Sequence, residues 1–173
     1  MGDAPKFTVD AQPFSAAAWA PFGWVPVPDT DTADGRHTLH FEWADPHLNT
    51  IHHRADEVPH TDRGLVCTVM YHHVTHTQAL MPLDARAVIA VAPASVAFSR
   101  PDDLDEIRAF VVEPGDVFVL HQGTWHWGPF PIEAAPVVRL LNVQGRRYAE
   151  DNTSVDLPAR AGSVVEVVVP HSG

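Results

Sequence analysis

The stretch "PGDVFVLHQGTWH", residues 114–126, decides the fold of this chain. It opens with the turn signal Pro-Gly-Asp, continues through four apolar residues and turns again at Gly123. Glycine reaches positive φ without strain, so it permits a tight reversal between two strands. His126 follows three residues later, where a strand of a small barrel would point it into the barrel's mouth. The stretch therefore predicts two successive barrel strands that deliver a histidine to a pocket.

Short apolar runs, this stretch included, fill the chain from residue 65 onward. They are rich in Val, Ile and Phe, which favour strands, and the 16 prolines of the sequence oppose long helices. Close spacing of such runs indicates a β-sandwich or barrel, so we expect an all-β fold with one or two short helices. The runs are LVCTVMYHH (65–73), RAVIAVAP (86–93), SVAFSR (95–100), IRAFVVE (107–113), DVFVLH (116–121), VVRLLNVQ (137–144) and VVEVVV (164–169).

The N-terminal part contains the best helix candidate. Ser15 is a plausible N-cap for a short helix from Ala16, which Pro21 and Gly23 end. The following "WVPV" (24–27) is interpreted as an edge strand, because proline is tolerated at sheet edges.

Residues 28–64 are polar and rich in His and Asp, without sustained periodicity. We interpret them as long loops with one or two edge strands, one of them "RHTLHFEW" (36–43). The sequence has no linker and no internal repeat, which predicts a single domain. Its expected parts are a short helix and edge strand in 7–27, the loop region 28–64 and a barrel core over 65–170, within 1–173.

Composition excludes several classes of partner and compartment. The chain has 11 Lys and Arg against 22 Asp and Glu, a formal net charge of −11, so we expect no DNA or RNA partner. Cys67 is the only cysteine and lies in an apolar run, which favours a core residue over a nucleophile. The sequence has no signal-peptide pattern and no stretch as long as a membrane span. We therefore expect a cytoplasmic protein without a membrane partner.

The stretch 114–126 resembles the second sequence motif of cupins, PG-D-x4-P-x-G-x2-H, with His121 in place of the usual proline. This resemblance implies a cupin-type double-stranded β-helix, a jelly-roll barrel, in which the histidine matching His126 is a metal ligand in metal-binding members. The first cupin motif, HxH-x(3,4)-E, has its spacing in "YHHVTHTQ", with Tyr71 and Gln78 replacing a His and the Glu.

Positions two apart in a strand share a face, so Tyr71 and His73 would both point into the barrel while His72 points outward. His76 falls near the turn and could supply an extra metal ligand. The predicted ligands of a divalent metal (nickel, manganese, zinc or iron) are His73, Gln78 and His126, with His76 as an addition; the alternative is a site without a metal.

A wider resemblance is to the ureidoglycolate lyase family, formerly called ureidoglycolate hydrolase. That family carries an N-terminal block ending in PFG, a block with His, Gln-Ala and Pro, a PD-x4-RAF block and a terminal WH-x-P block. The blocks occur here in the same order, as "QPFSAAAWAPFGWV" (12–25), "HHVTHTQALMPLDARAVIAVAP" (72–93), "PDDLDEIRAF" (101–110) and "WHWGPF" (125–130).

This resemblance implies a dimeric cupin enzyme, an amidine-lyase that splits ureidoglycolate into glyoxylate and urea in allantoin degradation and purine metabolism, in some members with a divalent metal. The family's His matches His73, its Gln matches Gln78, and its Trp-His pair matches Trp125 and His126. Tyr71 stands where the family usually has Glu.

The family's Asn-x-Gly…Arg segment has no clear counterpart in this sequence, so the resemblance does not indicate which residue holds the substrate carboxylate. A guanidinium binds a carboxylate bidentately, so Arg36 and Arg54 are the candidates. Trp125 and Trp127 alternate around His126; we expect one to pack in the core or a dimer interface and the other to line the pocket and contact substrate.

Release of urea from ureidoglycolate, a carbinolamide, needs a base for the hydroxyl proton, an acid for the departing nitrogen and an electrophile at the carboxylate and developing carbonyl. His73 and His126 are predicted as this acid–base pair or as metal ligands, since an ordinary pKa of about 6.5 suits either proton role. Gln78 is predicted as a ligand or a hydrogen-bond donor to a substrate oxygen, and Tyr71 as a proton donor.

Structural alternatives remain for the histidines. His126 could be a satisfied histidine at a strand end, and His121 is expected in a structural or rim role. His52, His53 and His60 are expected as solvated loop residues, with a contribution to the pocket as the less favoured interpretation. Two other functions also fit: a related cupin lyase, isomerase or oxygenase for another small carboxylate, and a non-catalytic cupin that senses a small ligand.

Overall fold

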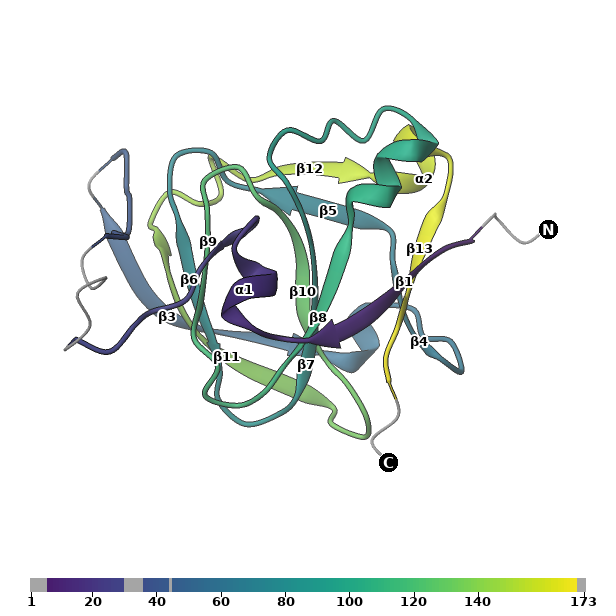
Figure 1. The fold of residues 1–173 in the computed structure, drawn as a ribbon, viewed down its shortest axis with the longest axis horizontal. Helices are drawn as coiled ribbons and strands as arrows, with labels where there is room; N and C mark the ends of the chain where they lie inside the picture. The colour runs from purple at the N-terminus through teal and green to yellow at the C-terminus, as the bar shows by residue number, and fades with distance from the viewer. Residues whose placement is uncertain (1–5, 30–35, 44, 171–173) are drawn as a thin grey trace.

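The computed structural model describes residues 6–29, 36–43 and 45–170. Strands dominate it (Figure 1): β1 (Lys6–Pro13), β2 (Gly23–Trp24), β3 (Pro46–Arg54), β4 (Gly64–Cys67), β5 (Val69–His72), β6 (Gln78–Pro82), β7 (Ala87–Ala92), β8 (Arg108–Val112), β9 (Phe118–Leu120), β10 (Trp125–Pro131), β11 (Val137–Gly145), β12 (Thr153–Asp156) and β13 (Val164–Val168). They form an eight-stranded sheet, β12-β5-β10-β7-β8-β1-β13-β4, and a five-stranded sheet, β2-β9-β6-β11-β3. The predicted all-β, cupin-like architecture is confirmed.

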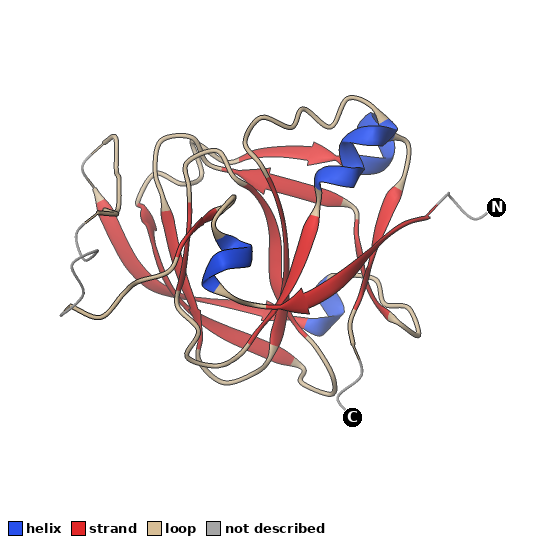
Figure 2. Cartoon of the chain, in the orientation of Figure 1, coloured by secondary structure: helices blue, strands red, loops and turns tan. Residues whose placement is uncertain are grey.

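Helical segments are short and flank the sheets (Figure 2): α1 (Ala16–Trp19), α2 (Leu157–Ala161) and the 3-10 segments η1 (Ala55–Glu57) and η2 (Pro101–Glu106). The helix predicted after Ser15 is α1, and the Ser15 hydroxyl accepts a hydrogen bond from the Ala18 amide at 3.2 Å. None of the helices in the described part of the chain is long and apolar enough to cross a membrane.

Strand β7 lies at the centre of the packing and separates two groups of buried side chains. Ile89 faces one group, which contains Trp19 of α1, while Val88 faces the other, which contains Trp125. All six residues of β7 are buried, which explains a sequence without polar alternation. Removal of apolar surface from water on both faces is the main force that holds the two sheets together.

The apolar run 95–100 is not a strand, contrary to the sequence prediction. It is an irregular segment in which Phe98 has φ 48° and is fully buried, with its ring centroid 5.5 Å from that of Trp125. The Val96 carbonyl accepts a hydrogen bond from the Trp125 indole at 2.8 Å. Its apolar residues therefore anchor a loop to the core instead of forming a ladder.

The N-terminal third has more β structure than the sequence indicated. β1, which was not predicted, pairs in parallel with both β13 and β8. The edge strand expected at 36–43 is wrong: that segment contributes only an isolated bridge from Phe41 to His76, and the edge strand is β3, which pairs with β11 along its whole length. The strand expected at 24–27 is reduced to β2, at the edge of the smaller sheet.

Candidate functional site

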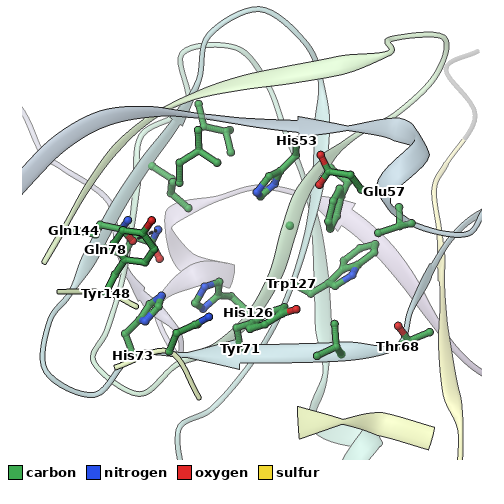
Figure 3. A pocket seen from close by; sticks show the side chains of 18 of the residues that line it. His53, Glu57, Thr68, Tyr71, His73, Gln78, His126, Trp127, Gln144 and Tyr148 are labelled. Carbon is green, nitrogen blue, oxygen red and sulfur yellow. Dashed lines mark hydrogen bonds between the residues drawn. The ribbon is translucent and has the colours of Figure 1, made fainter. Parts of the chain in front are cut away.

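A cavity of about 480 Å³ lies between β5 and β10 of the larger sheet and β3, β6 and β11 of the smaller one (Figure 3). Tyr71, His73, Gln78 and His126 all line it. β5 pairs with β10 so that Tyr71 is opposite His126, His73 follows β5 directly, and Gln78 begins β6. The two cupin-like motifs thus meet at one cavity as predicted, while the chemical role of each residue stays a prediction.

Hydrogen bonds to backbone carbonyls fix the orientation of two cavity histidines. His73 Nδ1 lies 3.2 Å from the Asp151 carbonyl, and His126 Nδ1 lies 3.3 Å from the Thr124 carbonyl. A carbonyl only accepts, so Nδ1 donates in both rings, and Nε2 of each neutral ring keeps its lone pair. The ring centroids are 5.4 Å apart. The pair therefore offers two proton acceptors side by side.

Burial keeps both histidines neutral. It lowers the pKa of His73, an effect that the nearby Asp151 partly opposes. It lowers the pKa of His126 to about 3, with a further contribution from His73. An imidazolium at His73 is thus the less costly of the two, because an opposite charge lies beside it.

The depressed pKa of His126 predicts acid sensitivity of the fold. Below pH 6.5 the unfolded chain binds a proton at this residue, whereas the folded chain does not until about pH 3. Stability therefore falls as the pH falls through this window, by about 2 kcal/mol at pH 5. Between pH 7.5 and pH 5, we expect the melting temperature of His126→Gln to fall by less than that of the parent protein, as measured by thermal unfolding.

The control for this prediction is the exposed His52. His52→Gln should show the same acid-induced loss as the parent protein. An equal loss in His126→Gln would contradict the assignment.

Asp151 organises the wall behind His73. Its carboxylate accepts hydrogen bonds from the Thr75 amide at 2.7 Å and the Thr75 hydroxyl at 2.6 Å, and lies 3.7 Å from Nδ1 of His76. Burial raises the pKa of Asp151, but the hydrogen bonds from Thr75, together with the Val74 backbone and the charge of His73, leave the pKa below its ordinary value. His76 stacks on His73 with centroids 4.7 Å apart. The loop that carries Asp151 thus supports the ring of His73 from behind.

Several cavity residues were not predicted, and β3 and β11 supply most of them. Asn49, Ile51 and His53 alternate on the inner face of β3, with Gln144 on β11 and Tyr148 beyond it. His53 lines the cavity, which bears out the less favoured interpretation of it as a pocket residue, and its Nδ1 lies 2.7 Å from the Pro129 carbonyl. The period-two alternation in 49–53 was the available signal, but polar residues on the inner face concealed it.

The other histidines considered from the sequence lie outside the cavity. His52 and His60 are exposed, as expected for solvated residues, and His121 is exposed at the turn between β9 and β10. His72 points away and stacks on Trp125 with centroids 3.8 Å apart. His76 does not line the cavity, but a narrow space behind it, with no room for a water molecule.

The cavity lies within a part of the chain that matches a known protein family. The family model of ureidoglycolate lyase matches residues 6–159, which include every cavity residue named above. The chain belongs to the ureidoglycolate lyase family. A search of curated proteins found no match.

In this ureidoglycolate lyase family member the two tryptophans divide as predicted. Trp125 packs in the core against Phe98, and Trp127 lines the cavity. The indole N–H groups of Trp19 and Trp125 each donate to a backbone carbonyl, whereas that of Trp127 has no partner among the described residues. A buried indole N–H usually finds an acceptor, so Trp127 offers a donor to a ligand.

The two arginines predicted to bind the carboxylate do not reach the cavity. Arg54 is exposed on β3 and forms an ion pair with Asp56 at 2.6 Å, and Arg36 is exposed as well. Arg54 fails because it follows His53, so alternation turns it to the outer face. Among the described residues that line the cavity, none is Lys or Arg.

The predicted metal ligands are His73, Gln78, His126 and His76, and their arrangement decides whether they could hold a metal. Two of these predicted ligands carry a buried atom without a hydrogen-bond partner, Nε2 of His76 and Oε1 of Gln78, and a metal could satisfy either. However, no three His, Cys, Asp or Glu side chains of the described residues are grouped as a metal site requires. The set His73, Gln78, His126 and His76 therefore does not fit a metal in this arrangement, and we derive no chemical step through one.

Proposed function

We propose that the protein is a carbon–nitrogen lyase that releases urea from ureidoglycolate and leaves glyoxylate. The observation that carries this proposal is the convergence of Tyr71, His73, Gln78 and His126 on one cavity, inside the range matched by the ureidoglycolate lyase family. Family membership gives the reaction class, and the cavity supplies groups that could perform it.

His73 is the base of the proposed reaction. Its Nε2 takes the hydroxyl proton of ureidoglycolate, the O–H electron pair becomes the carbonyl bond of glyoxylate, and the C–N bond breaks with its electrons on nitrogen. Asp151, beside His73, stabilises the imidazolium that forms. His126, with its pKa of about 3, is the weaker base and is assigned to accept a hydrogen bond from an N–H of the ureido group through its Nε2.

Tyr71 is the proton donor to the departing nitrogen. It lies opposite His126 across the β5–β10 ladder, and both residues line the cavity. The phenol has a dissociable proton that neither neutral histidine offers at Nε2. After urea leaves, the proton held by His73 restores the phenol, so the reaction consumes no proton.

The decisive experiment follows glyoxylate release from ureidoglycolate by the purified protein, against the spontaneous rate. Release well above that rate supports the proposal. Failure to exceed it, with and without added nickel or manganese, would overturn this substrate and leave another small carboxylate as the alternative.

Metal dependence is the second test. Because the described residues around the cavity do not group three His, Cys, Asp or Glu ligands, we expect turnover to survive dialysis against a chelator, with no metal in elemental analysis. Loss of turnover on chelation and its recovery with nickel or manganese would instead assign a metal to His73 and His126.

A homodimer in the cytoplasm and a role in allantoin degradation within purine metabolism remain predictions of the proposal. Size-exclusion chromatography with light scattering tests the dimer.

A further inference from the structure

Four amide side chains, three of them buried, form a cluster at one end of the cavity: Asn49 of β3, Gln78 of β6, and Asn142 and Gln144 of β11. Asn142 is 0% exposed, Gln144 4% and Gln78 6%. Asn142 pairs with Asn49 across the β11–β3 ladder, and Gln144 lies two residues further along the same inner face. Figure 3 shows Gln78 and Gln144 together at one end of the cavity, with Trp127 at the other.

The hydrogen bonds of this cluster run in one direction. The Asn142 amide nitrogen donates to Oδ1 of Asn49 at 2.7 Å. The Gln78 amide nitrogen donates to Oδ1 of Asn142 at 2.8 Å and to Oε1 of Gln144 at 3.2 Å. Both N–H groups of Gln78 are thus occupied, which corrects the prediction that Gln78 donates to a substrate oxygen.

This direction leaves two donors free. Asn49 and Gln144 each use their carbonyl oxygen inside the cluster, so their NH₂ groups, Nδ2 and Nε2, are what they can present to the cavity. Neither group has a hydrogen-bond partner among the described residues. Neither group is among the buried atoms that lack a partner, so both stay accessible, and a cavity lined by these two residues is suited to a ligand with acceptor oxygens.

Glu57 is the one Asp, Glu, Lys or Arg among the described residues that line the cavity, so an acceptor oxygen meets no cation there. No Lys or Arg is among the described residues that line it, and the candidate arginines lie outside. A carboxylate in this cavity must therefore be held by neutral donors, and hydrogen bonds from amides to an ionised acceptor are stronger than those to a neutral one.

We propose that Asn49 and Gln144 bind the carboxylate of the substrate through their side-chain NH₂ groups, and that Gln78 and Asn142 are positioning residues that hold those groups. The inference rests on the proposed function for its substrate. The two amides take the role that the sequence analysis gave to an arginine. The reacting carbon then lies beside His73 and His126, and the ureido group extends toward the free indole N–H of Trp127.

The test compares ureidoglycolate with N-(hydroxymethyl)urea, which has the same carbinolamide but no carboxylate. In Asn49→Leu and Gln144→Leu we expect KM for ureidoglycolate to rise by about ten- to a hundredfold, with kcat changed far less, because each variant removes one donor to a charged group. The KM for N-(hydroxymethyl)urea should stay close to the parent value. Gln144→Glu, which adds a like charge, should raise KM for ureidoglycolate further. Gln12→Leu, on the exposed side of β1, is the matched control.

Binding of glyoxylate, measured by calorimetry, separates this inference from the proposed function. If ureidoglycolate is not turned over but glyoxylate binds and Gln144→Leu weakens it at least tenfold, the carboxylate site stands and the function fails. No glyoxylate binding, equal binding to parent and variants, or equal losses on both substrates would overturn the carboxylate site. Circular dichroism of each variant identifies misfolding, and Asn49, on a half-exposed edge strand, gives an independent variant if Gln144→Leu does not fold.

Discussion

His73→Ala is expected to lower kcat for ureidoglycolate by about 10²- to 10⁴-fold, the usual contribution of a general base. A backbone carbonyl fixes the tautomer of both histidines, but His73 has two features that His126 lacks: the charge of Asp151 beside it and the stacked ring of His76 behind it. KM should change little, because the carboxylate and ureido groups keep their partners. Initial rates of glyoxylate release over a range of substrate concentrations measure both constants.

Two further variants sharpen this prediction. His52→Ala is the matched control, since His52 is exposed on the outer face of β3, and it should keep the parent kcat. Asp151→Asn removes the charge beside His73 while Thr75 can still donate to the amide oxygen, so kcat should fall less than in His73→Ala. A His73→Ala enzyme that retains the parent kcat would remove His73 from the chemistry and leave His126 as the base.

The pH profile of kcat/KM checks the same assignment. Burial lowers the pKa of His73, so the neutral base persists to lower pH than an ordinary histidine would allow. The acidic limb of the profile should therefore lie below pH 6.5, and a limb above that value would contradict a buried base.

Sequence patterns located the half of the site that has strong local signals. The glycine turn and strand before His126, and the two-residue spacing of Tyr71 and His73, depend only on short-range geometry, and the structure brings these residues to one cavity. The cupin-like fold followed from the same signals, because short Val-rich runs between turn residues define strands without long-range information.

The other half depends on which strands pair, and no local pattern specifies that. Asn49 and Gln144 lie almost a hundred residues apart and become neighbours only through the β3–β11 ladder. Polar residues on the inner face of β3 hide its alternation, so the sequence predicts a loop there. Arg54 was a candidate because of its charge, but its position in the strand turns it outward. Residues that bind a ligand break the apolar pattern that would otherwise reveal their strand.

Trp19→Ala is expected to destabilise the fold by about 3–5 kcal/mol, the usual cost of removing a buried Trp. Trp19 is fully buried, and its ring centroid lies 5.4 Å from that of Phe110 and 5.0 Å from that of Phe118 in edge-on geometry. Its indole nitrogen also donates to the Val119 carbonyl at 2.9 Å. The loss would lower the melting temperature by about 6–20 °C for a chain of this length.

The same variant tests how α1 supports the site. Trp19 donates to Val119 of β9, and Val119 pairs with Ala79 of β6, one residue from Gln78. Trp19 therefore supports, through β9, the strand that carries Gln78 of the amide cluster. Trp19→Phe keeps most of the ring contacts but leaves the Val119 carbonyl without its donor, and should cost less than Trp19→Ala. Trp24→Ala, in the edge strand β2 where the ring is only half-buried, is the control and should cost far less. Urea unfolding curves of the three variants give these free energies, and a Trp19→Ala curve that matches that of Trp24→Ala would show that α1 does not hold β9 in place.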